Sequence, residues 1–101
     1  MYIHNGDGKM VEEMKIIHAK LASSWHEEFV ADWIEIEGQM NEEVKKDLKL
    51  VELDNGKLGL DMSTIEERYG SSANAISDLK QKLENRGYKV IVKEEEIGKW
   101  W

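Results

Sequence analysis

Residues Ile65–Tyr88 read IEERYGSSANAISDLKQKLENRGY, and this stretch indicates more about the fold than any other part of the chain. Gly70 interrupts a short helical segment, because glycine is a poor helix former. Ser71 or Ser72 can then accept hydrogen bonds from the free N–H groups that begin a second helix. Gly87 fits the left-handed position that often follows a helix. The stretch therefore predicts two helices joined by a tight turn.

The second of these helices is amphipathic and leads into a strand. Its apolar residues recur every three or four positions, which is the spacing of one helix face: Ile76, Leu79 and Leu83. Residues 88–93, YKVIVK, then alternate between polar and apolar side chains, as strand residues do. We expect the apolar stripe of the helix to pack on the core.

This helix-turn-helix-strand order resembles the helix-turn-helix and first wing strand of winged-helix regulators. The resemblance rests on packing positions spread over the whole stretch: Ile65, Tyr69, Gly70, Ser72, Ile76, Leu83, Glu84, Gly87 and Tyr88. It implies that Ser72–Arg86 is a recognition helix, with its first residues at base edges and its basic residues at phosphates. The residues implied at a DNA interface are Ser72, Asn74, Ser77, Lys80 and Lys82.

Upstream of this stretch, the apolar spacing predicts two N-terminal helices. From Lys9 onward, apolar residues occur at intervals of four, three and four: Met10, Met14, Ile17 and Leu21. Ser24 and Glu27 fit a capping box that would begin the second helix, whose apolar stripe is Trp25, Phe29, Trp33, Ile36 and Met40. Residues 33–37, WIEIE, also alternate like a strand, and this alternative stays open.

A β-hairpin is predicted in the middle of the chain. The sequence Asp54-Asn55-Gly56 is a strong turn signal, because type I′ turns need positive φ at both central residues. With a two-residue loop, Leu53 would face Leu58 and Val51 would face Leu60. Both pairs would then lie on one side of the hairpin.

The remaining elements complete an α+β fold. Residues 44–48 are expected to add a helical turn, and Ser63 or Thr64 is expected to cap the helix that follows the hairpin. We therefore expect a single domain over residues 1–101. It would contain N-terminal helices, a small antiparallel β-hairpin, and a helix-turn-helix-like pair followed by a strand.

Composition limits the classes of function. The chain has 101 residues and no cysteine, which excludes disulfides and thiolate metal sites. Histidines lack metal-ligand spacing, paired glutamates project apart on a helix, and no phosphate-binding glycine loop or nucleophile motif occurs. No apolar run approaches the roughly 18 residues that cross a bilayer. We expect a cytoplasmic, non-enzymatic protein without metal, cofactor or membrane contact.

The net charge of −7 favours a protein partner. Between Leu21 and Val44 there are seven acidic residues and no Lys or Arg, whereas nucleic-acid binding needs cations. The preferred hypothesis is an inhibitor or adaptor that binds a partner, including a nucleic-acid-binding enzyme, through an acidic helix: Glu28, Asp32, Glu35 and Glu42. In style, the chain is similar to small regulators and inhibitors of phages and mobile elements. The alternatives are a dimeric winged-helix-like DNA-binding regulator and a small structural subunit.

Four tryptophans are many for a chain of this length. Trp25 and Trp33 fall on the predicted apolar stripe and are expected in the core. Trp100 and Trp101 either fold back onto the core or form an exposed anchor for a partner or a second copy. Folding back is the slightly favoured alternative.

Overall fold

A computed structural model of the chain describes residues 12–23 and 29–100. The described residues form five strands and three helices: β1 (Glu13–Ser23), β2 (Phe29–Glu37), α1 (Glu42–Leu48), β3 (Val51–Glu52), β4 (Leu58–Leu60), α2 (Met62–Tyr69), α3 (Ser72–Asn85) and β5 (Lys89–Trp100). The predicted α+β class is confirmed. The helix, turn, helix and strand predicted from residue 65 onward are also present, as α2, α3 and β5.

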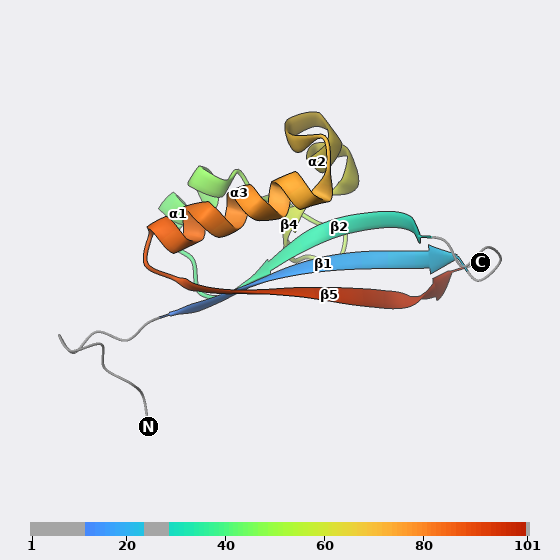
Figure 1. The fold of residues 1–101 in the computed structure, drawn as a ribbon, viewed down its shortest axis with the longest axis horizontal. Coiled ribbons are helices and arrows are strands. Elements are labelled where there is room, and N and C mark those ends of the chain that lie inside the picture. The colour runs from blue at the N-terminus through green and yellow to red at the C-terminus, as the bar shows by residue number, and fades with distance from the viewer. Residues whose placement is uncertain (1–11, 24–28, 101) are drawn as a thin grey trace, which may run out of the picture.

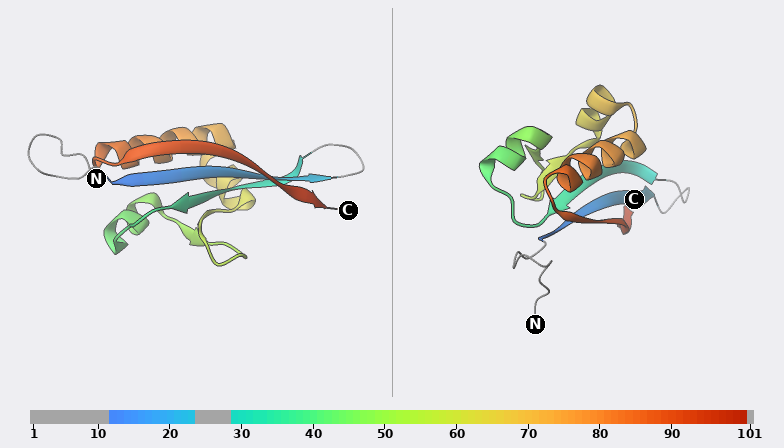
Figure 2. Two further views of the ribbon diagram at one scale, coloured as in Figure 1. Left: turned by 90° about the horizontal axis from the view of Figure 1, so that it is seen from below. Right: turned by 60° about the vertical axis from the view of Figure 1, so that its left-hand side comes forward.

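All five strands belong to one sheet, in the order β3-β4-β2-β1-β5. β2 runs antiparallel to both β1 and β4, while β5 runs parallel to β1 and forms one edge of the sheet. The three helices lie on one side of the strands (Figure 1). The opposite side is seen in the left view of Figure 2, where β5, β1 and β2 lie side by side.

The core lies between the sheet and the helices. α3 contributes the fully buried Leu79 and Leu83, which confirms most of the predicted stripe, while Ile76 is partly buried against the same cluster. Each such side chain contributes about 1.5–3 kcal/mol when it is fully buried. The other elements supply the remaining core residues: Met14, Ile16, Ile34, Ile36, Val44, Leu48, Leu60, Ile65 and Ala75.

The first predicted helix is wrong where the structure describes it, because residues 13–23 form β1. Met14 belongs to the core cluster beneath the helices, whereas Ile17 is an odd number of positions away and points to the other face of the sheet. Ile17 is nevertheless buried. A strand that buries residues on both faces has no clear period of two, so its apolar residues matched helical spacing by coincidence.

The second predicted helix is also wrong, because residues 29–37 form β2. The alternation of WIEIE identified the strand, since Ile34 and Ile36 enter the core while Trp33 and Glu35 lie on the opposite face. The proposed capping box of Ser24 and Glu27 lies outside the described residues. Pairing with β1 and β4 overrode the helical spacing of the tryptophans.

The helix ends agree with the sequence signals at α3 but not at α2. Ser71 caps α3 by accepting a hydrogen bond from the Asn74 N–H at 3.2 Å. Asp61, rather than Ser63 or Thr64, caps α2 by accepting from the Thr64 N–H at 2.8 Å. Ser63 and Thr64 lie inside the first turn of α2, where a side chain cannot cap the helix start.

The hairpin is present, but its register differs by one residue from the prediction. Val51 pairs with Gly59 instead of Leu60, and the loop contains three residues. Gly56 adopts a positive φ of 83° after a turn, which is typical of three-residue hairpin loops. Gly59 also allows β4 to pack closely on β2, because a Cβ at this position would overlap the Ile34 carbonyl oxygen of β2. Only glycine permits that close approach.

Candidate functional site

The acidic residues selected from the sequence do not share one helix face. Asp32 and Glu35 lie in β2 on opposite faces of the sheet, because they are three positions apart in a strand. Glu42 begins α1 and forms an exposed ion pair with Lys45, with 3.4 Å between Nζ and Oε1. Glu28 lies outside the described residues. The predicted acidic helix is therefore replaced by separate carboxylates with different surroundings.

Glu35 is a buried carboxylate whose hydrogen-bond partners all belong to the same chain. It is only 5% exposed, and it accepts hydrogen bonds from Trp33 Nε1 and Asn55 Nδ2 at 2.9 Å each and from Lys57 Nζ at 3.4 Å. Burial alone would raise its pKa, but these donors outweigh burial and hold the pKa below its usual value. Glu35 thus fastens the β3–β4 loop to the sheet.

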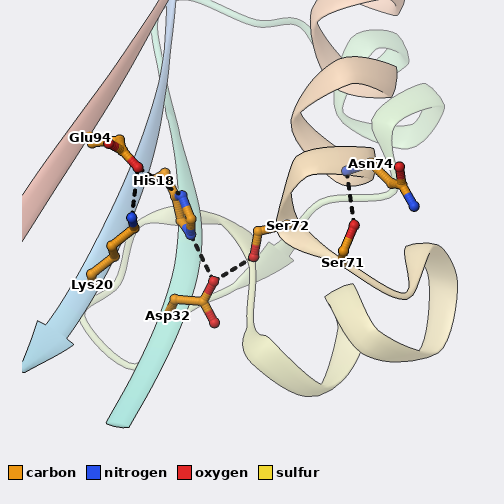
Figure 3. A network of polar contacts seen from close by, with 7 residues as sticks. All are labelled: His18, Lys20, Asp32, Ser71, Ser72, Asn74 and Glu94. Carbon is orange, nitrogen blue, oxygen red and sulfur yellow. Dashed lines mark hydrogen bonds and ion pairs between the residues drawn. The ribbon is translucent and has the colours of Figure 1, made fainter. Parts of the chain in front are cut away.

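Asp32 lies on the helix side and joins three elements (Figure 3). Its Oδ2 accepts a hydrogen bond from Ser72 Oγ of α3 at 2.5 Å and lies 2.7 Å from His18 Nε2 of β1. Burial would raise the pKa of Asp32, but the bonds from Ser72 and His18 outweigh it, so the pKa is lowered. The other carboxylate oxygen points away from both donors in Figure 3.

The combination of serine, histidine and aspartate does not have the geometry of a catalytic triad. In a triad the serine donates to the imidazole, whereas Ser72 donates to Asp32. His18 Nδ1 lies 3.8 Å from Glu94 Oε1, and Glu94 also binds Lys20 at 2.7 Å. These residues form a polar network that joins β1, β2, β5 and α3.

A pocket opens beside Asp32, between β2, the β3–β4 loop and the start of α2. Its volume is about 240 Å³, and eight residues line it: Asp32, Trp33, Glu52, Leu53, Asp54, Asn55, Asp61 and Met62. Four of these are carboxylates, and none is Lys or Arg. We call this feature the Asp32 pocket.

Two carboxylates of the Asp32 pocket, Asp32 and Asp61, have lowered pKa values. Hydrogen bonds from Thr64 lower the pKa of Asp61. Among the described residues, no Lys or Arg forms an ion pair with Glu52, Asp54 or Asp61. Met62 is 41% exposed, which places an apolar side chain at the rim. This lining suits a cationic group with an apolar stem.

A second hollow in the described chain has no single charge that would favour one kind of ligand. A wider hollow of about 800 Å³ at the end of β2 is lined by groups of both charges, including Glu37, Lys45 and Lys57. Within residues 12–23 and 29–100, no group of three His, Cys, Asp or Glu side chains could hold a metal ion. None of the described helices is long and apolar enough to cross a membrane.

The residues implied at a DNA interface are divided by the fold. Asn74, Ser77 and Lys80 lie on the exposed side of α3. Ser72 is instead turned toward the sheet by its bond to Asp32, and Lys82 pairs with Asp78 at 3.2 Å. The structure therefore brings together three of the five residues.

The placement of the terminal tryptophan side chains remains a prediction. Trp100 closes β5 by its backbone, but its side chain and all of Trp101 lie outside what the structure describes, as does Trp25. Trp33 is partly buried and donates its indole N–H to Glu35. The expectation of a core position is thus met only in part for Trp33.

Most of the Asp32 pocket was not found from the sequence. Glu52 lies in β3, Asp54 in the β3–β4 loop and Asp61 at the cap of α2. All three are 20 or more positions from Asp32 and meet it only in the folded chain. The available signal was the acidic character of residues 52–61 around a turn. Comparison of the chain with family models, curated proteins and solved structures gives no match.

Proposed function

We propose that this protein is a non-enzymatic adaptor or inhibitor that binds a protein partner through the Asp32 pocket. The observation that supports the proposal is a concave site with four carboxylates and no basic residue in its lining. The chain as a whole carries a charge of −7, which would steer a basic partner toward it. The acidic partner-binding surface is thus a pocket rather than the face of one helix.

An arginine side chain of the partner is the group that the pocket fits best. Its guanidinium can bond to carboxylates on several sides, and its weak hydration lowers the cost of entering a partly apolar site. Trp33 and Met62 offer apolar surface to the arginine stem. Nucleic-acid-binding enzymes present arginine-rich surfaces, so such an enzyme is the partner class that this chemistry favours.

The test is an NMR titration of the uniformly ¹⁵N-labelled protein with the capped tripeptide acetyl-Gly-Arg-Gly-amide. We expect shifts confined to the pocket, including the Trp33 indole and the Asn55 side-chain amide, and weaker binding at high salt. The tripeptide with Glu in place of Arg should cause no such shifts. Arginine-induced shifts that are spread evenly over the surface would contradict the proposal.

A pair of matched variants separates pocket binding from general charge. E52Q/D54N removes two exposed charges from the pocket, and E13Q/E84Q removes two exposed charges elsewhere. Glu84 is 12 positions along α3 from Ser72, about 18 Å by helix geometry. We expect E52Q/D54N to weaken arginine binding roughly tenfold and E13Q/E84Q to leave it nearly unchanged. Equal effects of both variants would contradict the pocket.

DNA binding by α3 is the second candidate function. The order α2, turn, α3 and β5 supports it, with Asn74, Ser77 and Lys80 on the exposed side of α3. Phosphate contacts make such binding fall steeply with salt. A titration of duplex DNA at low and high salt tests it, and the absence of binding at low salt would eliminate this candidate.

A further inference from the structure

The outer edge of β5 is a long strand edge with no partner strand among the described residues. The Lys89 N–H donates to the Glu12 carbonyl on the β1 side at 2.9 Å. Backbone groups alternate in direction along a strand, so Val92, Glu94 and Glu96 direct their N–H and C=O groups outward. Such an edge is a template for pairing with another strand.

We propose that this edge pairs with β5 of a second copy of the chain, antiparallel and about a two-fold axis at Glu94. A two-fold axis perpendicular to the sheet keeps every side chain on its own face. Residues opposite each other must therefore be an even number of positions apart. Under this constraint Lys93 can face Glu95 of the second copy, but not Glu94 or Glu96.

Charge complementarity supports this register. Lys93 and Glu95 are both exposed, and they share the sheet face that the helices do not cover. Among the described residues, neither has an ion pair within its own chain. With the axis at Glu94, the dimer contains two Lys93–Glu95 pairs related by symmetry. An axis at Lys93 would instead place two lysines opposite each other.

The backbone geometry of this register strengthens these pairs. Lys93 and Glu95 direct their backbone groups toward β1, so across the new interface they occupy non-hydrogen-bonded positions. In such positions the Cα atoms are about 4.5 Å apart and the side chains approach closely. The two Glu94 carboxylates near the axis are each neutralised by Lys20 of the same chain at 2.7 Å.

Apolar burial adds to the charge pairing. Val92 is 42% exposed. Within the described chain, the exposed large apolar residues are Val92 and Met62. In the dimer, Val92 would lie against Glu96 of the second copy and lose part of that exposure.

Sedimentation equilibrium of charge-reversal variants tests the register. K93E or E95K alone replaces two attractive pairs with two repulsive pairs, and we expect each to weaken dimerisation about tenfold or more. The swap K93E/E95K recreates both pairs in reverse and should restore the wild-type dimer. K80E, an exposed charge reversal on α3, is the control and should dimerise like wild type. Circular dichroism confirms that each variant is folded.

Disulfide cross-linking locates the axis independently. The chain has no cysteine, so E94C introduces a single thiol that lies opposite itself only in the proposed register. The two Cα atoms would be about 5.5 Å apart, within the range of disulfides. E96C is the control, because its two copies would be separated by four residues, about 13 Å. We expect oxidation to give covalent dimer for E94C and monomer for E96C.

These two experiments test dimerisation through β5 and do not depend on whether the Asp32 pocket binds arginine. A monomeric wild-type protein, a swap that fails to restore the dimer, or preferential cross-linking of E96C would overturn it. The pocket lies on the β4 side of β2, and β5 lies beyond β1 on the other side. Arginine binding should therefore be unchanged in K93E and E95K.

Discussion

Ser72 Oγ donates a hydrogen bond to Asp32 Oδ2 at 2.5 Å and so joins the first turn of α3 to β2 across 40 positions of sequence. The same oxygen contacts His18 Nε2 at 2.7 Å. One carboxylate oxygen thus holds a helix start and two neighbouring strands together, beside the pocket that Asp32 also lines.

Removing either partner of this bond should destabilise the fold. We expect S72A to lower the free energy of unfolding by about 1 kcal/mol. D32N should cost more, because it also removes the charge that His18 contacts. The double variant should cost less than the sum of the two single variants, as measured by urea denaturation. Additive effects would show that the bond contributes little.

Acidification should also destabilise the protein. The pKa values of Asp32, Glu35 and Asp78 are lower in the folded chain than their ordinary values. These groups bind protons more weakly in the folded state, so their stabilisation is present above the ordinary carboxyl range of about 4 and is lost as pH falls through the folded pKa values. The thermal midpoint should fall between pH 6 and pH 3. The variant D32N/E35Q should show a flatter profile.

Tyr69 should titrate later than an ordinary tyrosine. Burial and the hydrogen bond that its hydroxyl donates to Asp78 at 2.7 Å raise the pKa of Tyr69 to about 12. Because the folded pKa exceeds the unfolded value, the associated stabilisation is complete below about pH 10 and is lost as the pH rises toward 12. Ultraviolet absorbance should show a late phenolate transition that Y69F removes. Persistence of that transition in Y69F would assign it to another tyrosine.

Gly59 should not tolerate alanine. Its added Cβ would overlap the Ile34 carbonyl oxygen, so β4 would have to move away from β2. We expect G59A to lower the free energy of unfolding by about 2 kcal/mol or more, measured by chemical denaturation. The control is G56N, because Gly56 faces open space and asparagine tolerates its positive φ better than other residues. Equal effects of G59A and G56N would contradict the close approach.

The C-terminal half of the fold was predicted better than the N-terminal half, for a physical reason. Around α3, the cap at Ser71, the stripe ending at Leu83 and the left-handed Gly87 all indicate one helix. In β1, both faces of the strand are buried, as Met14 and Ile17 show, so the pattern has no period of two. Local signals determine α3, while pairing with distant strands determines β1.

The candidate site was less accessible from the sequence than the fold. Asp32 was selected for its charge. Because it was expected on a helix face, the residues expected beside it were the wrong ones. The pocket depends on the β3–β4 hairpin lying beside β2, and that placement depends on Gly59, whose lack of a side chain is no signal of charge or function. Glu35 illustrates the same difficulty, because its donors Asn55 and Lys57 are at least 20 positions away.

The parallel pairing of β5 with β1 has a consequence for synthesis. Glu13 pairs with Lys89, so the sheet joins segments separated by 76 positions. Every residue from Glu13 to Lys89 must be synthesised before this pairing can begin, and closing so large a loop slows folding. A nascent chain that stops before Lys89 would leave β1 without a neighbouring strand on that side.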